Sequence, residues 1–413
     1  MRIERPRGTR DFLPDEMEKR RAVERVIRKI VESYGYREVL TPTFEHLELF
    51  TIKSGEGIIE EIYTFKDKGG RDLALRPELT APVMRMFVNE CAGMPRPLRF
   101  YYFTNCFRYE RPQKGRYREF WQFGVELIGS SSPLADAEVI CLAYRIMSEL
   151  KLKFDLHIGH VGLLRYILRN VREEYASKIM RLIDKKDIDG LNKYMNEIGV
   201  ENKVKEILLT LVELRGCSEV IEDVKRIVPD FDFTHIERVC EVLDNLDVEY
   251  KLDFGIARGL DYYTGIVFEA YAKEGLGAQN QICGGGSYRL AHLFGGDDVP
   301  ATGFALGFDR IVEICNINGE KRKVVIVANV KGLEIEAFKI AEMLRGKGIT
   351  AIVDVMERNL KKQMSYANDI NADIAIIIGE KELKEGKVGL KDLKSGEQRS
   401  VKIKELSEII LKI

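Results

Sequence analysis

The sequence predicts an α+β protein that combines a large antiparallel sheet with a small C-terminal α/β domain. Two long strand-like segments, 98–110 and 120–127, flank a short charged loop, which is typical of an antiparallel hairpin. A highly charged stretch from 161 to about 248 has apolar residues at helical spacing and no strand pattern. After residue 320 short apolar strands alternate with helical segments, which indicates a partly parallel sheet.

Length and composition agree with this organisation. The 413 residues are 45% hydrophobic and 32% charged, as in soluble globular proteins with sizeable cores. We expect a first domain at 1–320 that carries a helical insertion at about 165–248, and a second domain at 321–413. The formal net charge is −1, so a nucleic acid would have to meet local basic patches rather than a basic molecule.

The cysteines and the apolar runs indicate a cytoplasmic protein. Seven widely spaced cysteines contain no C-x-x-C pair, which argues against a disulfide framework and against a zinc site. No apolar run reaches the ~18 residues of a membrane span. The charged N-terminus lacks the apolar core of a signal peptide. We therefore expect reduced thiols, no membrane association and no metal site built by protein side chains.

The elements expected along the chain follow from hydrophobic periodicity. An amphipathic helix at 15–34 precedes a short strand at 37–40, which ends before Pro42 because proline is confined to edges, ends and interfaces of sheets. Small residues at 303, 305 and 307 favour close helix packing, so 304–314 is interpreted as one helix. The other helices are expected at 79–90, 135–150, 333–346 and 359–370, and the other strands at 62–65, 73–76, 154–158, 252–254, 266–270, 324–330, 349–355 and 374–378.

The loop of the long hairpin carries a dense cluster of charged residues. Its members are Arg108, Glu110, Arg111, Lys114, Arg116 and Arg118. The planar fork of arginine binds phosphate bidentately, which makes Arg108 and Arg116 candidate nucleotide ligands. Phe120 is placed to stack on a purine, with Arg310 on the other face of that purine. The chain has no G-x-x-x-x-G-K-[ST] and no strand-linked G-x-G-x-x-G segment. A solvated charged loop is the alternative interpretation.

The strand after this loop places polar side chains on one face. Gln122, Gly124 and Glu126 alternate, so they point to the same side as Phe120, while Trp121 points to the other side. Burying an amide or a carboxylate without partners costs about 1–3 kcal/mol. The face therefore predicts a polar ligand, unless it is open to solvent.

Three further segments carry polar chemistry, and each has a structural alternative. Residues 258–265 (RGLDYYTG) offer a cation and phenol groups beside a tight backbone, or form a turn with core tyrosines. Residues 303–310 (GFALGFDR) place an arginine one turn into the expected helix, facing either a ligand or solvent. Residues 76–80 (RPELT) present a carboxylate to an amine, or begin a helix with an acidic first turn.

Together these segments resemble the histidyl-tRNA synthetases, which are class IIa aminoacyl-tRNA synthetases, and the resemblance spans nearly the whole chain. It implies a class II antiparallel-sheet catalytic domain with a helical insertion, followed by an anticodon-binding α/β domain. The matching segments are the family's opening at 7–14, motif 1 at 34–42, motif 2 at 107–126, the histidine-specific RGLDYYTG at 258–265 and motif 3 at 303–310. Motif 2 and RGLDYYTG are specific, and the latter separates this family from the threonyl, prolyl and glycyl relatives.

The resemblance also implies a role for each matching position. Arg108 and Arg258 would be catalytic, because both would contact the histidine carboxylate and the α-phosphate of ATP. The histidine-binding residues would be Glu78, Leu79, Thr80, Arg108, Gln122, Glu126, Arg258, Tyr262 and Tyr263. The ATP-binding residues would be Arg108, Glu110, Arg116, Phe120 and Arg310. Arg111 and Gln113 would contact the acceptor end of the tRNA.

The activity that these roles imply is ATP-dependent ligation of L-histidine to its tRNA through a histidyl-adenylate, with release of AMP and pyrophosphate. Mg²⁺ would neutralise the pyrophosphate, and motif 1 would form a homodimer. From Lys323 onward 17 Lys and Arg stand against 14 Asp and Glu, an excess of three positive charges, which is compatible with RNA contact.

One departure and two rival functions remain. The family often has GGGRYD where this chain has GGGSYR at 284–289, so Ser287 and Arg289 replace an arginine and an aspartate. One rival is a catalytically silent relative, the regulatory subunit of ATP phosphoribosyltransferase, which usually lacks the C-terminal domain. The presence of that domain and of Arg108, Arg258 and Arg310 disfavours it. The other rival is a synthetase for another amino acid, which RGLDYYTG and Glu126 disfavour.

Overall fold

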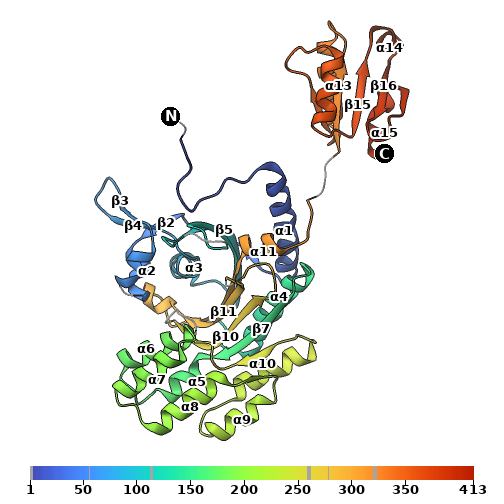
Figure 1. Cartoon of the computed structure of the whole chain (residues 1–413). Coiled ribbons are helices and arrows are strands. Elements are labelled where there is room, and N and C mark those ends of the chain that lie inside the picture. The colour runs from blue at the N-terminus through green and yellow to red at the C-terminus, as the bar shows by residue number, and fades with distance from the viewer. Residues whose placement is uncertain (1–2, 55, 112–114, 258–261, 278, 320–322) are drawn as a thin grey trace. The chain divides into compact units, whose positions relative to one another are not determined.

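The chain is described by a computed structural model that covers residues 3–54, 56–111, 115–257, 262–277, 279–319 and 323–413 (Figure 1). It divides into two compact units, residues 1–319 and 320–413. The predicted α+β class is confirmed, because a large, mostly antiparallel sheet with helices precedes a separate α/β unit. Among the described residues, none of the helices has the length and apolarity that a membrane crossing requires.

The first unit is built on one large sheet, which has nine strands within the described residues. In spatial order they are β1 (Arg37–Glu38), β5 (Leu98–Phe107), β6 (Glu119–Ile128), β12 (Pro300–Gly307), β11 (Gln281–Arg289), β10 (Tyr263–Ala272), β7 (Phe154–His160), β9 (Lys251–Asp253) and β8 (Arg215–Gly216). The predicted long hairpin is β5–β6, which pairs antiparallel from Leu98–Ile128 to Phe107–Glu119.

The two faces of β5 and β6 have different surroundings because successive side chains alternate. Phe123, Val125 and Tyr101 point into the main core, which is covered by α1 (Pro14–Ser33) and α4 (Pro133–Glu149). Trp121 lies on this side too and packs against Phe103, with ring centroids 5.0 Å apart, as expected from its position. The opposite face carries the polar side chains of Gln122 and Glu126, beside a second cluster of buried apolar residues that includes Phe100 and Cys106.

The interpretation of 304–314 as one helix is wrong. Residues up to Gly307 belong to strand β12, between β6 and β11, and only α11 (Phe308–Ile314) is helical. The small residues at 303 and 305 are explained by alternation along a strand, where Phe304 and Leu306 are buried on the other face. Arg310 consequently lies in the first turn of a short helix that begins where the strand ends.

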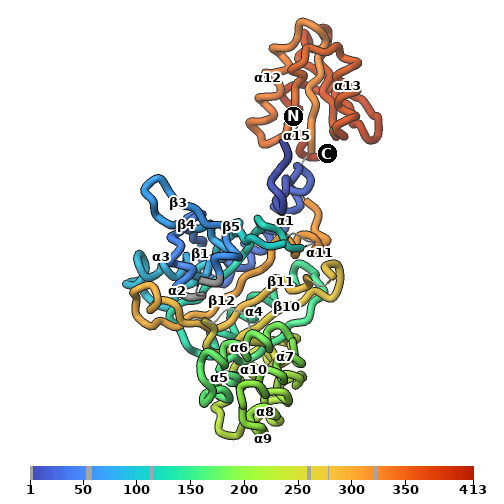
Figure 2. The backbone as a smooth tube through the Cα atoms, turned by 60° about the vertical axis from the view of Figure 1, so that its left-hand side comes forward, coloured from blue at the N-terminus to red at the C-terminus, as the bar shows by residue number. Residues whose placement is uncertain are grey.

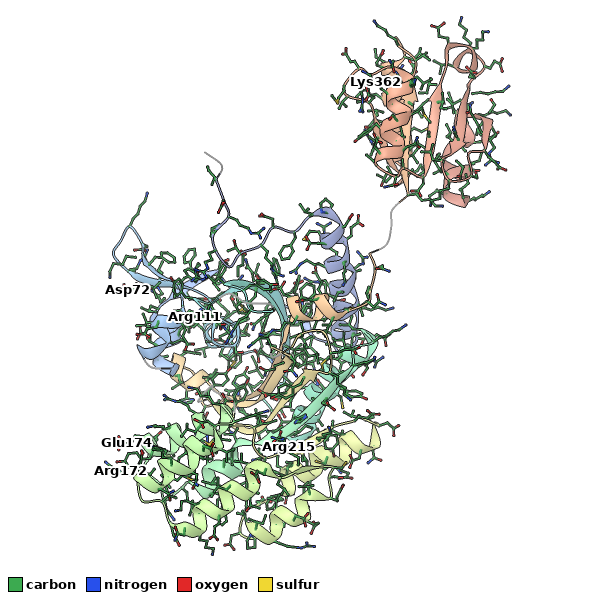
Figure 3. The ribbon with its side chains drawn as sticks, in the orientation of Figure 1. Asp72, Arg111, Arg172, Glu174, Arg215 and Lys362 are labelled. Atoms are coloured by element: carbon green, nitrogen blue, oxygen red, sulfur yellow. The ribbon has the colours of Figure 1, made fainter. Side chains whose placement is uncertain are left out.

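The charged stretch after β7 forms a group of helices beside β10 and β7, seen from two sides in Figures 1 and 2. These helices are α5 (Val161–Ile167), α6 (Glu173–Asp184), α7 (Ile188–Glu197), α8 (Asn202–Glu213), α9 (Val220–Ile227) and α10 (Thr234–Asn245). The expectation that this stretch holds no strand is wrong for the two residues of β8, which pair with β9. Arg215 of β8, labelled in Figure 3, forms an ion pair of 2.9 Å with the buried Asp253 of β9.

A small sheet lies next to the main one. Its strands are β2 (Phe44–His46), β4 (Asp72–Leu75) and β3 (Thr64–Lys66), and β3 and β4 correspond to the strands expected at 62–65 and 73–76. It is accompanied by α2 (Glu48–Ser54), a 3-10 helix (Glu56–Glu61), α3 (Thr80–Met86), a π-helical turn (Phe87–Cys91) and a second 3-10 helix (Ala291–Phe294). The buried Arg76 after β4 donates to the backbone oxygens of Thr41 (2.8 Å) and Asn105 (2.9 Å), which ties this sheet to β5.

The second unit contains a five-stranded mixed sheet. The spatial order is β14 (Thr350–Val353), β13 (Val324–Asn329), β15 (Ile374–Ile378), β16 (Lys387–Asp392) and β17 (Gln398–Lys402). The first three strands are parallel, as predicted, and the last two, which the pattern did not predict, are antiparallel. The helices are α12 (Glu334–Arg345), α13 (Leu360–Asp369), α14 (Glu380–Lys384) and α15 (Leu406–Lys412), with a 3-10 turn at Ile403–Glu405.

Gly285→Ala is expected to lower the free energy of unfolding by roughly 2 kcal/mol, because a Cβ there overpacks the sheet. That atom would lie 2.2 Å from the backbone oxygen of Gly303 and 2.6 Å from the Cβ of Phe304. Gly93→Ala is the matched control, since nothing lies within 4 Å of its Cβ position. Urea unfolding followed by circular dichroism measures both, and equal stabilities of the two variants would contradict the close approach at β11.

Candidate active site

Two adjoining cavities lie over the face of the large sheet that carries Gln122 and Glu126. The larger has a volume of about 550 Å³ and the smaller about 60 Å³. Arg108, Gln122, Gly284 and Ala305 line both, so the cavities meet at the middle of β6, β11 and β12. The site therefore has a small pocket that opens into a large one.

The small pocket is built around a buried carboxyl group. Glu126 is 1% exposed, and its Oε2 accepts a hydrogen bond from Tyr288 OH at 2.6 Å. Its Oε1 accepts from Thr80 Oγ1 at 3.0 Å and from Tyr102 OH at 3.5 Å. Burial raises the pKa of Glu126 to about 8, although the Tyr288 and Thr80 hydrogen bonds act in the opposite direction. The pocket therefore holds a carboxyl group that is close to its titration point at neutral pH.

Two glycines make room for this carboxyl group and its neighbours. A Cβ on Gly303 would come within 2.1 Å of Glu126 Oε2, and a Cβ on Gly124 would come within 2.3 Å of the Tyr102 hydroxyl. Gly124 lies inside β6 and Gly303 inside β12, so the absence of a side chain at these positions makes room for the pocket and does not serve a turn.

The segment before α3 supplies one wall of the same pocket. Glu78, Leu79 and Thr80 all line it. The Glu78 carboxylate accepts from the backbone N–H groups of Thr80 (2.8 Å) and Ala81 (3.1 Å), which is the helix-start arrangement considered as the alternative for 76–80. The carboxylate that accepts from the first backbone N–H groups of α3 thus also borders the pocket.

The tyrosines of RGLDYYTG form the opposite wall. Tyr262 and Tyr263 are buried and stack with ring centroids 4.6 Å apart. Tyr262 also meets the ring of Tyr288 edge-on at 5.6 Å. These contacts fix the aromatic side of the pocket around the Glu126 carboxyl group.

The large cavity is lined by positive charge from three different elements. Arg108 lies over the ring of Phe120, with its Cζ 5.1 Å from the centroid, and its Nε donates to Pro77 O at 3.0 Å. Arg310 donates from Nε to Gly115 O at 2.8 Å and from Nη1 to Gln281 O at 2.6 Å. Arg108 after β5, Arg116 of the hairpin loop and Arg310 of α11 thus line the same cavity.

Electrostatics in the large cavity favour an anion. The pKa of Arg310 lies below its usual range because the group is buried and because Arg116 and Arg108 repel its charge. Arg116 forms an ion pair with Glu110, which compensates part of the positive charge. A ligand that brings several negative charges would relieve the repulsion among the three guanidinium groups.

The carboxylates of the large cavity fit a metal ion that arrives with a nucleotide. Glu110 and Glu269 line the cavity, and Gln281 Nε2 donates to Glu269 Oε1 at 2.8 Å. Magnesium is usually held by one or two carboxylates together with substrate phosphates. In the part of the chain that the structure describes, no group of three or more His, Cys, Asp or Glu side chains is arranged to hold a metal.

Most of the predicted site residues therefore come together, and several partners were missed. Arg111 is exposed and lies beside the hairpin end (Figure 3), whereas Gln113 and Arg258 lie outside the described residues. The partners that sequence reasoning did not assign are Tyr102, Tyr288, Gln279, Gln281 and Asp309. Alternation along β5 could have placed Tyr102 on one face with Cys106, and Tyr288 stands between Ser287 and Arg289 in GGGSYR.

The departure at GGGSYR has a structural explanation. Residues 284–286 lie within strand β11, and Ser287 Oγ donates to Asp136 Oδ1 at 2.8 Å. The other oxygen of Asp136 is 2.8 Å from His235 Nε2 on α10. Arg289 pairs with Asp298 at 2.8 Å. Strand β11 is thus joined to α4 through Ser287 and Asp136, and Asp136 in turn contacts His235 of α10.

Comparisons with known proteins agree over both units. A family model for histidyl-tRNA synthetases matches residues 8–311, and a model for an anticodon-binding domain matches residues 323–413. The histidine–tRNA ligase of Archaeoglobus fulgidus is 62% identical over 410 residues, which are 99% of this chain and 100% of that protein. The ligase of the same name from Methanosarcina acetivorans is 54% identical over 411 residues, 99% of each chain.

A solved structure extends the agreement to three dimensions. The crystal structure of histidyl-tRNA synthetase from Nostoc sp. PCC 7120 matches with a TM-score of 0.81 at 26% sequence identity. The match covers 100% of this chain and 99% of that one. Because the first family model alone spans most of the sequence, the chain belongs to the histidyl-tRNA synthetase family.

Proposed function

We propose that this aminoacyl-tRNA synthetase joins L-histidine to its tRNA in two steps, and that the two adjoining cavities hold the two substrates of the first step. The observation that carries the proposal is the buried Glu126 carboxyl group in a pocket that opens into an arginine-lined cavity. A small pocket with an acid at its end suits an imidazole, and a larger cationic cavity suits a triphosphate.

The small pocket would take the amino acid. Glu126 and Tyr263 would hydrogen-bond the two imidazole nitrogens, with Gln122 and Tyr262 lining the pocket beside them. Glu78 and Thr80 would hold the α-amino group, with Leu79 packed behind them. Thr80 Oγ1 donates to Glu126 Oε1 at 3.0 Å, so the residues proposed for the α-amino group and for the imidazole belong to one hydrogen-bond network.

The large cavity would take ATP. Phe120 would stack on the adenine with Arg310 on its other face, and Glu110 and Arg116 would engage the phosphates. Magnesium carried by the phosphates, within reach of Glu110 and Glu269, would neutralise charge on the pyrophosphate leaving group. Arg108, which borders both cavities, lies where the carboxylate of histidine and the α-phosphate of ATP would meet.

In the first step a carboxylate oxygen of histidine would attack the α-phosphorus, and the bond to the pyrophosphate would break. Arg108 and Arg258 would stabilise the charge that develops on the α-phosphate. Reactions of this type depend on positioning and on charge stabilisation more than on a general base. In the second step a hydroxyl at the tRNA 3′ end would attack the carbonyl of the adenylate, and AMP would leave.

The tRNA contacts follow from the same arrangement. Arg111 and Gln113 of the motif 2 loop would meet the acceptor end, and the C-terminal unit would read the anticodon. The proposal includes a cytoplasmic location, which rests on the seven cysteines being free thiols, six of them buried. A silent regulatory role is disfavoured because Arg108 and Arg310 both face the large cavity.

The proposal also includes a homodimer formed through motif 1. Leu40, which follows β1 at the edge of the large sheet, is 74% exposed, and Phe44 (52%) and Phe65 (42%) of the small sheet are exposed as well. Phe44 and Phe65 touch edge-on, with ring centroids 6.1 Å apart, so the exposed surface is contiguous there. An apolar surface at a sheet edge is typical of an interface between subunits.

ATP–pyrophosphate exchange is expected to depend on histidine, since the adenylate forms only when the small pocket is filled. The assay is run with each of the twenty amino acids. Equal exchange with threonine or proline, or none with histidine, would refute the proposed specificity.

Arg258→Ala is expected to abolish exchange while the circular dichroism spectrum stays that of the folded protein.

Glu126→Gln is expected to lower kcat/KM for histidine roughly 100-fold, because an amide replaces a charged hydrogen-bond acceptor.

The same substitution should also change how the free energy of unfolding depends on pH. Because the pKa of Glu126 rises from 4.5 to about 8 on folding, its stabilising effect is complete below pH 4.5 and is lost as the pH rises to 8. The variant is therefore expected to lie within about 1 kcal/mol of the ligand-free wild type at pH 5 and to exceed its free energy of unfolding by up to ~5 kcal/mol at pH 9, since one pKa unit corresponds to about 1.4 kcal/mol.

Urea unfolding at pH 5 and pH 9 measures this difference. Glu149→Gln, which changes an exposed carboxyl group on α4, serves as the control and should follow the wild type at both pH values. If Glu126→Gln loses as much stability with rising pH as the wild type does, Glu126 is not the group that titrates.

Leu40→Glu is expected to convert the dimer to a monomer, because it places a charge in the apolar interface. Light scattering of the wild type should give about twice the chain mass of 47.3 kDa. Leu246→Glu, at an exposed position (59%) after α10, should leave the mass unchanged. A wild-type protein that scatters as a single chain would contradict the dimer.

A further inference from the structure

We propose that the segment Pro6–Leu13, called here the N-terminal strap, holds the motif 2 loop in place for ATP binding, and that Arg10 is the positioning residue. The strap is the part of the chain that precedes α1 in Figure 1. The proposal rests on the proposed function, because it assigns a role in binding ATP. It adds a residue outside the two cavities to the set that serves the reaction.

The strap begins with a turn that needs its glycine. Thr9 N donates to Pro6 O at 3.2 Å, and Gly8 between them has a φ of 86°, as a type II turn requires at its third position. Thr9 Oγ1 donates a second hydrogen bond to Pro6 O at 2.8 Å. The turn leaves the carbonyl of Gly8 pointing outward, where it accepts from Arg118 N at 2.9 Å. The backbone of the strap is therefore bonded directly to the end of the motif 2 loop.

Arg10 adds a side-chain contact to the adjacent residue of that loop. Its Cζ lies 3.5 Å from the centroid of the Tyr117 ring. Its Nη2 is 2.7 Å from Asp309 Oδ1. One guanidinium group thus bridges Tyr117 of the loop and the residue that precedes Arg310 on α11. Stacking of this kind is favourable when the cation is largely removed from water.

Asp309 connects the strap to the core. Its side chain is 5% exposed, and Arg20 of α1 reaches the same Oδ1 at 2.6 Å. Its Oδ2 accepts from the backbone N–H of Trp121 at 2.7 Å, at the start of β6. Two arginines therefore share one carboxylate, so Arg20 still neutralises Asp309 if Arg10 is removed. Loss of Arg10 should release the loop without leaving a buried charge unpaired.

The loop that the strap holds also borders the large cavity. Gly115 O accepts from Arg310 Nε at 2.8 Å, and Arg116 and Tyr117 line the cavity. None of the residues 6–13 lines either cavity among the described lining residues. The strap therefore acts on ATP through the residues that it contacts, Tyr117 of the loop and Asp309 beside Arg310. Its loss should weaken ATP binding and spare the histidine pocket, which is formed by other elements.

The test compares Arg10→Ala with Arg5→Ala in histidine-dependent ATP–pyrophosphate exchange. Arg5 lies just before the strap and forms an exposed pair of 3.5 Å with Asp11, so Arg5→Ala should behave as the wild type. Arg10→Ala is expected to raise KM for ATP about tenfold, to leave KM for histidine within twofold and to keep the melting temperature within a few degrees. A tenfold change corresponds to about 1.4 kcal/mol, which the stacking of Arg10 on Tyr117 and its ion pair with Asp309 can supply together.

A second pair of variants tests the stacking itself. Tyr117→Leu removes the ring under Arg10 and should raise KM for ATP, whereas Tyr117→Phe keeps the ring and should raise KM for ATP less. In the Arg10→Ala protein, Tyr117→Leu should add less than threefold, because the shared contact is already gone. Multiplicative effects of the two changes would overturn the coupling, and this outcome is measurable even if one variant is less stable.

The outcomes separate this proposal from the proposed function. A wild-type protein without histidine-dependent exchange overturns the function. A wild-type protein that exchanges normally, together with an Arg10→Ala variant that has unchanged KM for ATP, overturns the strap alone. A parallel rise of KM for ATP and histidine with a large drop in melting temperature would assign Arg10 to folding and would also overturn it.

Discussion

Antiparallel pairing of β6 with both β5 and β12 is the constraint on which the rest of the structure depends. This register sends Phe123 and Val125 into the main core and Gln122 and Glu126 into the site. A slip of one residue would exchange the two sets, burying polar groups under α4 and placing apolar ones in the cavities. The hydrophobic core and the chemistry of the site are therefore specified by a single pairing, and neither is adjustable without the other.

The protein surroundings alone leave two charged groups of the site unfavourably placed. Burial holds the pKa of Glu126 near 8, and burial together with repulsion from Arg116 and Arg108 lowers the pKa of Arg310. Both conditions are costly in a low-dielectric environment, and both are relieved by ligands of the right kind. The small pocket favours a hydrogen-bonding base and the large cavity favours a polyanion, so the electrostatics divide the site in the same way as its shape does.

Two buried aspartates join separate parts of the chain around the site. Asp309 gathers α1, the N-terminal strap and the start of β6 behind Arg310. On the other side, Asp136 receives Ser287 from β11 and contacts His235 from α10, which links the helical group to the strand that carries GGGSYR. Each carboxylate is buried and holds partners from at least two separate parts of the chain. Such hubs orient the groups that contact ligands, because each partner restricts the others.

The sequence by itself determined the α+β class, the long hairpin, the helical stretch and the shared face of Gln122 and Glu126, because these follow from local periodicity. It also marked Arg108, Arg116 and Arg310 by motif. It misread Phe304–Gly307 as helical, because small residues satisfy close packing in a helix and close approach between strands equally well. Only the tertiary structure decided that Gly303 makes room for Glu126 and that Tyr102 and Tyr288 complete its hydrogen bonds. The position of the Arg10 guanidinium over the Tyr117 ring was also decided only by the tertiary structure. These contacts join residues that are distant along the chain, and no local pattern encodes which of them will meet.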